Sequence, residues 1–330
     1  MDRGSPTLVD VARAAGVSKS LVSLAIRGDA GVSEATRSRI LATAAALGYR
    51  SNALARGLAM GRTRTVAVLL SGLRNTYHAE VAQGIEVAAA DLGLDTILGQ
   101  GDNDPATLGR RLDRVLEMGV DGVIVVSALL EPELLDRVDA RTPVVMVGRP
   151  FRLPERVSVI RNDDEEGVAA AMAHLLDLGH RRIVHVARST RAAATARRAA
   201  YVEAMDRAGL RALTIDANRE LDAWLDAVAP SPRDRPTAVV AGNDRVAIAV
   251  MHGAQERGLR VPDDLSVVGY DNLELASMVR PALTTVDQPR ELMGREAMRL
   301  LAERIEGHGR AIEIALAPRL VVRGSTAPAA

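Results

Sequence analysis

From Thr65 onward, short apolar segments alternate with longer segments of helical character, and this alternation constrains the fold more than any other feature of the sequence. The strand-like segments are residues 65–70, 94–98, 120–127, 143–147, 182–187, 237–241 and 265–270. Apolar strands separated by helices favour parallel sheets that are covered by helices on both faces. Since the region is longer than one such sheet usually needs, it predicts an α/β core of two doubly wound parallel-sheet subdomains.

Polar side chains follow several of these strands. In doubly wound folds, ligands bind at the carboxyl ends of the strands and in the cleft between two lobes. The candidate ligand-binding residues are therefore Ser71, Asn75, Tyr77, Ser127, Arg149, Asn243, Asp244, Asp271 and Asn272. Asn243 and Asp244 have an alternative role, because either can cap the helix that follows.

Two short helices are predicted near the N-terminus. Thr7 and Asp10 resemble a capping box for the first helix, which Gly16 ends, and Ser18 caps a second helix that extends to about Ile26. Its inward side carries Leu21, Val22, Ala25 and Ile26, and its outward side carries Lys19, Ser20, Ser23, Leu24 and Arg27. Two short helices joined by a turn, the second with small polar and cationic side chains outward, are typical of a helix-turn-helix.

A third helix and a linker complete this N-terminal region. The third helix begins at Ser33 and ends at Gly48, and its expected inward residues are Ile40, Leu41, Ala44 and Leu47. Residues 49–65 have too few large apolar side chains to form a core, so they are predicted to be a linker. Within the linker, Asn52 can cap a helix over residues 53–59 that is too short to be stable alone.

The charge is distributed unevenly along the chain. The whole sequence has 42 basic and 42 acidic residues, but residues 1–64 have ten Lys or Arg against four Asp or Glu. A basic N-terminal module on an acidic body is typical of an appended nucleic-acid-binding domain. The chain has no cysteine, and it has no apolar segment of signal-peptide or membrane-spanning length. We therefore expect a cytoplasmic protein without a membrane partner.

The sequence contains no phosphate-binding loop and no nucleophile-elbow motif, so we expect neither an enzyme nor a cofactor. Asp102 and Asp104 begin a segment like a calcium loop, but it lacks the required glycine and glutamate, which favours a helix-capping turn. Three histidines lie close in sequence without the spacing of a zinc site, and we expect them to be structural. They are His174, His180 and His185.

Seven segments between Thr7 and Thr326 resemble the lactose-repressor/galactose-repressor (LacI/GalR) family of bacterial transcription regulators. They are "TLVDVARAAGVSKSLVSLAIRG", "VSEATRSRILATAAALGYRSNALARGL", "LGHRRIVHV", "TAVVAGNDRVAIAVM", "GLRVPDDLSVVGYDN", "PALTTVDQP" and "LVVRGST". The resemblance implies an all-α helix-turn-helix headpiece, a hinge helix, and a periplasmic-binding-protein-like core that closes on a small effector. The corresponding ranges are residues 1–50, 51–64 and 65–330, with an N-subdomain of about 65–160 and 288–318 and a C-subdomain of about 161–287 and 319–330.

The resemblance also implies which residues contact DNA. The second helix lies in the major groove, where Lys19, Ser20 and Ser23 read bases beside Leu24 and Arg27; Thr7 and Ser18 complete this set. Lysine can donate a hydrogen bond to guanine, and serine can either donate a hydrogen bond to a base or accept one. The family commonly has arginine at the position of Leu24, which instead either contacts a thymine methyl group or packs on the headpiece.

In the hinge, the residue that the family inserts into the minor groove corresponds to Leu58. Asn52, Ala55 and Arg56 accompany it. A pair of leucines from two subunits unstacks a central base step and bends the DNA. The alternative is that Leu58 only covers the junction to the core.

For the effector, Tyr77, Arg149, Arg197, Asn243 and Asp271 match family positions that commonly reach the ligand, although Arg197 could also be a surface charge. A sugar is the leading candidate, since a carboxylate, an amide and an arginine can bind vicinal hydroxyls while a ring covers the apolar face. Aromatic residues make up only 2% of the chain, which leaves nucleosides, polyols and small acids open. The segment between Leu210 and Ala238 is shorter than in relatives, so a cleft wall near Trp224 can be altered.

No heptad-bearing helix follows "VVRGSTAPAA", so we expect a homodimer rather than a tetramer, and a pseudo-palindromic operator. The alternative function is a solute-binding protein of a transporter. That class shares the core, but residues 1–60 and the lack of an export signal argue against it.

Overall fold

The structure is a computed structural model that describes residues 6–27, 29–49, 62–231 and 235–329. The chain forms two compact units, residues 1–63 and 64–330, and each is described by itself. No helix of the described residues is long and apolar enough to cross a membrane.

The first unit contains three helices, α1 (Leu8–Ala15), α2 (Lys19–Arg27) and α3 (Glu34–Ala46), as the sequence predicts. Thr7 and Asp10 form the predicted capping box, and Gly16 has a φ of 66°, which lets the chain turn directly into α2. Seven small or medium apolar side chains form the core of this unit: Val11, Ala12, Ala15, Val22, Ala25, Ile40 and Ala44.

The prediction for the inward face of α3 is only half right. Ile40 and Ala44 are buried, but Leu41 is 47% exposed and Leu47 is 41% exposed. One residue along a helix rotates the side chain by about 100°, which moves Leu41 off the narrow stripe that contacts α1 and α2. Leu47 lies beyond the last residue of α3, where it caps the helix.

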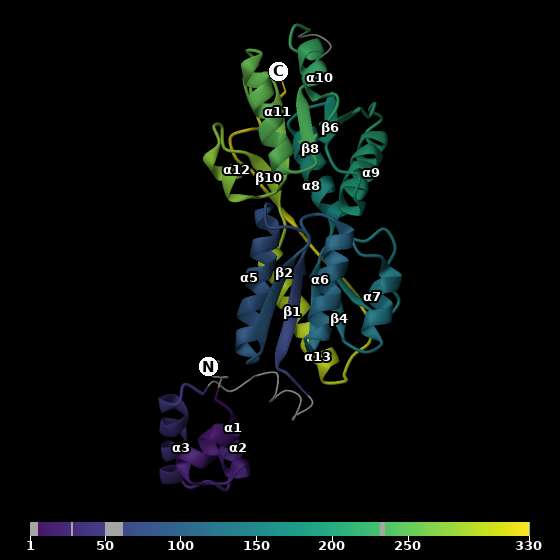
Figure 1. The fold of residues 1–330 in the computed structure, drawn as a ribbon. Coiled ribbons are helices and arrows are strands. Elements are labelled where there is room, and N and C mark those ends of the chain that lie inside the picture. Colours follow the sequence, from purple (N-terminus) through teal and green to yellow (C-terminus); the bar gives the residue numbers. More distant parts are fainter. Residues whose placement is uncertain (1–5, 28, 50–61, 232–234, 330) are drawn as a thin grey trace. The chain divides into compact units, whose positions relative to one another are not determined.

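The first lobe of the second unit is a six-stranded sheet with the strand order β11-β5-β4-β3-β1-β2, in which all paired strands are parallel. Its strands are β1 (Thr65–Leu70), β2 (Asp95–Gln100), β3 (Gly122–Val126), β4 (Val144–Val147), β5 (Ser158–Asn162) and β11 (Glu313–Leu316). Helices α5 (Thr76–Asp91) and α13 (Arg290–Ile305) pack on one face. Helices α6 (Pro105–Glu117) and α7 (Pro132–Asp139) pack on the other (Figure 1).

The second lobe has the strand order β12-β10-β9-β8-β6-β7, and β12 is antiparallel to β10. Its strands are β6 (Ile183–Ala187), β7 (Thr214–Asp216), β8 (Ala238–Ala241), β9 (Ser266–Asp271), β10 (Thr284–Asp287) and β12 (Arg319–Val321). Helices α8 (Asp164–Asp177) and α9 (Ala192–Arg207) cover one face. The other face is covered by α10 (Leu221–Val228), α11 (Asp244–Glu256) and α12 (Glu274–Met278).

The chain passes between the two sheets three times, from β5 to α8, from β10 to α13, and from β11 to β12. The two doubly wound lobes are therefore each assembled from distant parts of the sequence. All seven predicted strands are present, but β5, β7, β10, β11 and β12 were not predicted. Trp224 is buried in the core between α10 and its sheet, so the expectation that it lies near a cleft wall is wrong.

Candidate functional site

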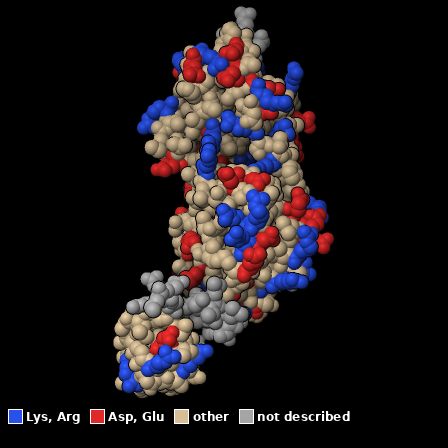
Figure 2. All heavy atoms as spheres, viewed as in Figure 1, with Lys and Arg blue, Asp and Glu red and all other residues tan. Residues whose placement is uncertain are grey.

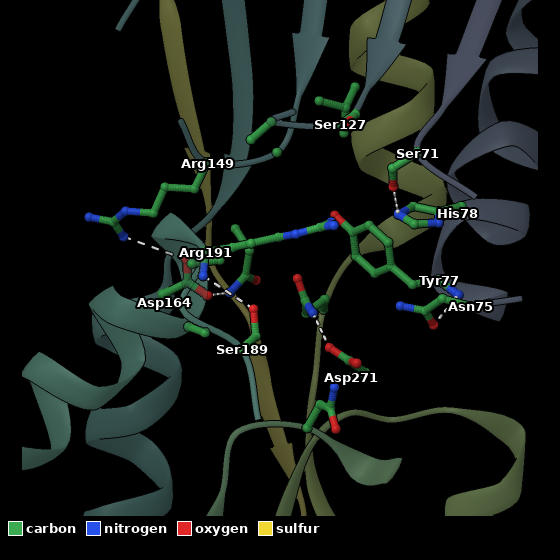
Figure 3. Close-up of a pocket in the computed structure, with 18 of the residues that line it drawn as sticks. Ser71, Asn75, Tyr77, His78, Ser127, Arg149, Asp164, Ser189, Arg191 and Asp271 are labelled. Atoms are coloured by element: carbon green, nitrogen blue, oxygen red, sulfur yellow. Dashed lines mark hydrogen bonds and ion pairs between the residues drawn. The ribbon is translucent and has the colours of Figure 1, made fainter. Parts of the chain in front are cut away.

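A cavity of about 200 Å³ lies at the carboxyl ends of strands from both sheets (Figure 3). All eight residues that the sequence predicts as effector-binding line it: Ser71, Asn75, Tyr77, Ser127, Arg149, Arg197, Asn243 and Asp271. Asp244 and Asn272 do not belong to the lining. The strand-end rule accounts for seven of the eight, from both lobes, whereas Arg197 lies within α9 and was implied only by the family resemblance.

Six further polar side chains line the cavity: His78, Asn162, Asp164, Ser189, Arg191 and Gln288. Asn162 and Asp164 lie at and just after the end of β5, and Gln288 directly follows β10. They were missed because these two strands were not predicted. Ser189 and Arg191 follow the predicted strand 182–187, so the same rule could have identified them.

Arg197 is the central buried cation of the cavity. Its Nε donates to Asp164 Oδ1 at 2.8 Å and its Nη1 donates to the Gly242 carbonyl at 2.8 Å. The guanidinium lies 3.7 Å above the centre of the Tyr270 ring, and Nη1 lies 3.8 Å from Asp271 Oδ1. With 9% of its surface exposed, Arg197 is not a surface charge.

Asp271 ends β9 with a φ of 113°, a conformation that residues other than glycine rarely adopt. Gln288 Nε2 donates to its Oδ1 at 2.5 Å. Burial raises the pKa of Asp271 to about 6, although the neighbouring cations Arg197 and Arg290 lower it. The carboxylate is thus poised to titrate near neutral pH.

Asp244 lies outside the cavity lining. It accepts a hydrogen bond of 2.5 Å from the Thr285 hydroxyl and one of 2.7 Å from the Leu273 N–H. Burial, with a further contribution from the negative charge of Asp271, raises the pKa of Asp244 to about 7. Asp244 is the first residue of α11 and does not cap it.

Two cavity amides cap helices. Asn243 Oδ1 accepts from the Val246 N–H at 3.0 Å at the start of α11, so the capping alternative is correct for this residue. Asn75 Oδ1 accepts from the Tyr77 N–H at 3.2 Å at the start of α5. Capping fixes both side chains at the cavity wall.

Asn162 and Asp164 are almost fully buried, with 4% and 1% exposed surface. Asn162 Nδ2 donates to the Tyr270 hydroxyl at 2.7 Å, but no described residue donates a hydrogen bond to Asn162 Oδ1 or Asp164 Oδ2. Arg149 Nη1 lies 3.5 Å from Asp164 Oδ2 as an ion pair, while the Arg149 guanidinium donates to both oxygens of Glu165. Unpartnered buried acceptors favour a ligand or water that donates hydrogen bonds.

In the first unit, the outward side chains of α2 lie as the helical phase predicts. Lys19 and Ser20 are exposed and Ser23 is partly exposed. Leu24 is half-buried, yet it is not among the side chains that pack on the core of this unit. Figure 2 shows Lys and Arg side chains gathered on one side of this unit.

The other predicted DNA contacts have different positions. Thr7 is engaged in the capping box, and the Ser18 hydroxyl accepts from the Leu21 N–H at 3.2 Å. The side chain of Arg27 and the hinge residues Asn52, Ala55, Arg56 and Leu58 lie outside the described residues.

The three histidines and Asp104 of the calcium-like segment have structural partners. His180 bonds Thr237 and the Ala327 carbonyl, His174 bonds Thr326, and His185 bonds the Val240 carbonyl. Asp104 is the N-cap of α6. Among the described residues, no cluster of potential ligands could hold a metal ion.

Residues 7–52 match the profile of bacterial regulatory proteins of the lacI family, and residues 172–326 match a periplasmic binding protein-like domain. The chain is 34% identical over 304 residues to catabolite control protein A of Priestia megaterium, covering 90% of this chain and 92% of that protein. It also resembles the lac repressor dimer bound to operator and the anti-inducer ONPF, with a TM-score of 0.85, 26% identity, and 98% and 99% of the two chains covered. The transcriptional regulator CelR in complex with cellobiose gives a TM-score of 0.70, 33% identity, and 97% and 99% coverage.

Proposed function

The chain belongs to the lacI family of bacterial regulatory proteins and is a DNA-binding transcriptional regulator, and on this premise we propose that it is an effector-controlled repressor. It binds a pseudo-palindromic operator as a homodimer, and a small molecule in the cavity sets its affinity for that operator. Residues 1–50 form the headpiece, residues 51–64 the hinge, and residues 65–330 the two-lobed core. The relatives are regulators rather than enzymes; the absence of catalysis and a cytoplasmic location are parts of the proposal.

The exposed outward face of α2 is the main support for DNA binding. Lys19, Ser20 and Ser23 lie on that face, within a segment that matches the family profile. In a helix-turn-helix, the second helix enters the major groove and its outward side chains contact base edges. Leu24 takes part through a thymine methyl group, which agrees with its position off the headpiece core.

The hinge contributes a minor-groove contact in this proposal. Leu58 is inserted at the central base step, with Asn52, Ala55 and Arg56 beside it. Substitution Leu58→Ala is expected to lower specific operator affinity and leave effector binding intact. Unchanged operator affinity in a retardation assay would contradict the minor-groove role.

The cavity between the lobes is the proposed effector site. Its eight predicted residues combine hydroxyls, amides, arginines and a carboxylate, which suit a polyhydroxylated molecule. The complex of CelR with cellobiose supports a sugar-like ligand in this fold. Neither a metal nor a cofactor is required.

The test is retardation of DNA fragments from the protein's own genomic neighbourhood, with the full chain and with a chain that lacks residues 1–62. The full chain is expected to retard one palindromic fragment with an affinity that falls steeply as salt rises, because phosphate contacts release counterions. The shortened chain is expected to retard none. Failure of the full chain to bind any fragment specifically would overturn the proposal.

A further inference from the structure

Arg191 is the one arginine of the described cavity lining whose guanidinium has no hydrogen bond or ion pair with a described residue. Arg197 is paired with Asp164, and Arg149 is paired with Glu165 and Asp164. Arg191 precedes α9 in the second lobe. Burial lowers the pKa of His78 in the first lobe, and the positive charge of Arg191 adds a smaller contribution. Figure 3 places Arg191, Ser189 and Asp164 on one side of the cavity and Tyr77 and His78 on the other.

The backbone next to Arg191 adds to its positive potential. Helix α9 begins at Ala192 without a side-chain cap and without an acidic residue in its first turn. Ala193 and Ala194 line the cavity, and the N–H groups of the first helical turn have neither an intrahelical acceptor nor a side-chain cap. A helix N-terminus favours an anion electrostatically.

The acidic residues of the cavity do not cancel this potential. The Asp164 carboxylate is held by Arg197 at 2.8 Å, and Asp271 has a neighbouring Arg197 and a hydrogen bond from Gln288. Glu165 is held by Arg149. Asp164 and Asp271 share Arg197, and Glu165 does not belong to the lining. The lining therefore has three arginines against two aspartates, which leaves one positive charge in excess.

The same cavity also requires hydrogen-bond donors from its ligand. Asn162 Oδ1 and Asp164 Oδ2 are buried and accept no hydrogen bond from a described residue, although Arg149 Nη1 lies 3.5 Å from Asp164 Oδ2 as an ion pair. His78 cannot supply one, because its ring nitrogens already lie 3.1 Å from the Ser71 hydroxyl and 2.6 Å from the Gly72 carbonyl. Tyr77 is the single aromatic ring other than His78 in the described lining, so stacking contributes little.

We infer that the effector is a polyol with one anionic group, a carboxylate or a phosphate, whose charge binds Arg191 and the N-terminus of α9. Its hydroxyl groups donate to Asn162 Oδ1 and Asp164 Oδ2. This inference rests on the proposed function, since it specifies the ligand class of the same site. Arg191 is thereby a specificity-determining residue that selects charged over neutral polyols.

The experiment measures thermal unfolding and calorimetric binding of the full chain with matched ligands. The pairs are D-gluconate with D-sorbitol, and D-ribose 5-phosphate with D-ribose, and inorganic phosphate is added alone. We expect the anionic member of one pair to bind at least about tenfold more tightly than its neutral partner, and its affinity to fall as ionic strength rises. The pair that responds distinguishes a carboxylate from a phosphate.

Substitution Arg191→Gln is expected to remove the preference, so that the charged and the neutral member bind with equal affinity. Arg188→Gln is the matched control, because Arg188 follows the same strand but lines a different cavity. The control is expected to keep the preference.

Four results would each overturn the inference. Two concern the preference: charged and neutral members bind equally, or the preference survives Arg191→Gln. The other two are binding of inorganic phosphate as tight as that of the polyol phosphate, and no binding by any member. The first of these leaves the proposed function standing, because a neutral effector still occupies the cavity. In the fourth case, operator retardation decides the proposed function independently.

Discussion

The headpiece and the two-lobed core hold their candidate functional side chains in opposite ways. In the headpiece they lie on the exposed side of one short helix, where Lys19 and Ser20 face solvent. In the core they come from strand ends far apart in the sequence, and Arg197, Asp164 and Asp271 are buried and bonded to one another or to backbone. A substitution on the exposed helix therefore affects contacts alone, whereas one in the cavity affects both binding and folding.

The two units also differ in how much apolar surface stabilises them. The headpiece has a single cluster of seven buried side chains, of which four are alanines. The core has four larger clusters, two on the faces of each sheet. Since small domains are marginally stable, the headpiece should be the more sensitive unit to loss of one apolar side chain.

The largest effect is expected in the core from Asp164→Ala. This change leaves the buried Arg197 guanidinium without its nearest carboxylate, and loss of one partner of a buried pair costs about 3–5 kcal/mol. Thermal unfolding of the core and ligand binding should both be impaired. The neighbouring Glu165→Ala is the control, because Glu165 is partly exposed and its ion pair is worth at most about 1 kcal/mol. If Glu165→Ala lowered thermal stability and ligand binding as much as Asp164→Ala, the distinction between buried and exposed ion pairs would be wrong.

In the headpiece, Ile40→Ala is expected to cost about 2–5 kcal/mol, because Ile40 is fully buried in a small core. Operator retardation should be lost while ligand-induced stabilisation of the core is kept. Leu41→Ala serves as the matched control, since Leu41 is 47% exposed. If Leu41→Ala impaired operator binding as much as Ile40→Ala, the helical face assigned to the core would be wrong.

Asp244 makes a larger contribution than Asp271 to the pH dependence of core stability, since the pKa of Asp271 is raised only to about 6. The pKa of Asp244 is raised from 3.8 to about 7 in the folded protein, so the native state binds the proton more tightly than the unfolded chain. The stabilisation is present below about pH 4 and is lost as pH rises through about 7, with each pKa unit worth about 1.4 kcal/mol. Asp244→Asn should flatten the fall in melting temperature between pH 4 and pH 7. An unchanged slope would contradict this assignment.

The smallest effect on folding is expected from Lys19→Ala. Operator affinity should fall by about 1–3 kcal/mol if the ammonium group contacts a base, while the melting temperature is unchanged because Lys19 is exposed. Lys19→Arg tests whether the positive charge is sufficient. Undiminished operator affinity in Lys19→Ala would remove this residue from the DNA-reading face.

More of the headpiece than of the core cavity could be predicted from the sequence, because helical phase is a local property. A helix has one repeating phase, so the outward face of α2 and the caps at Thr7 and Ser18 could be derived locally. The helical phase of α3 does not show how wide the stripe of side chains that contacts α1 and α2 is. Leu41 and Leu47 were therefore wrongly assigned to the core.

In the core, long apolar strands were predictable, and with them seven of the cavity residues that follow them. Arg197 lies within α9 and was implied only by the family resemblance. Strand β5 contains Ser158, Arg161 and Asn162, and β10 begins with two threonines, so neither has the apolar run of a buried strand. Without these strands, Asn162, Asp164 and Gln288 had no predicted position. Their place in the cavity depends on the chain passing between the lobes, which local sequence does not encode.

A ligand in the cavity is proposed to set the affinity of the headpiece for its operator. The most direct measurement is the operator dissociation constant of the full chain, with and without a saturating concentration of the ligand that most raises its melting temperature. A coupling of about 1–3 kcal/mol predicts a change of about 5–150-fold. The same dissociation constant with and without that ligand would contradict the account.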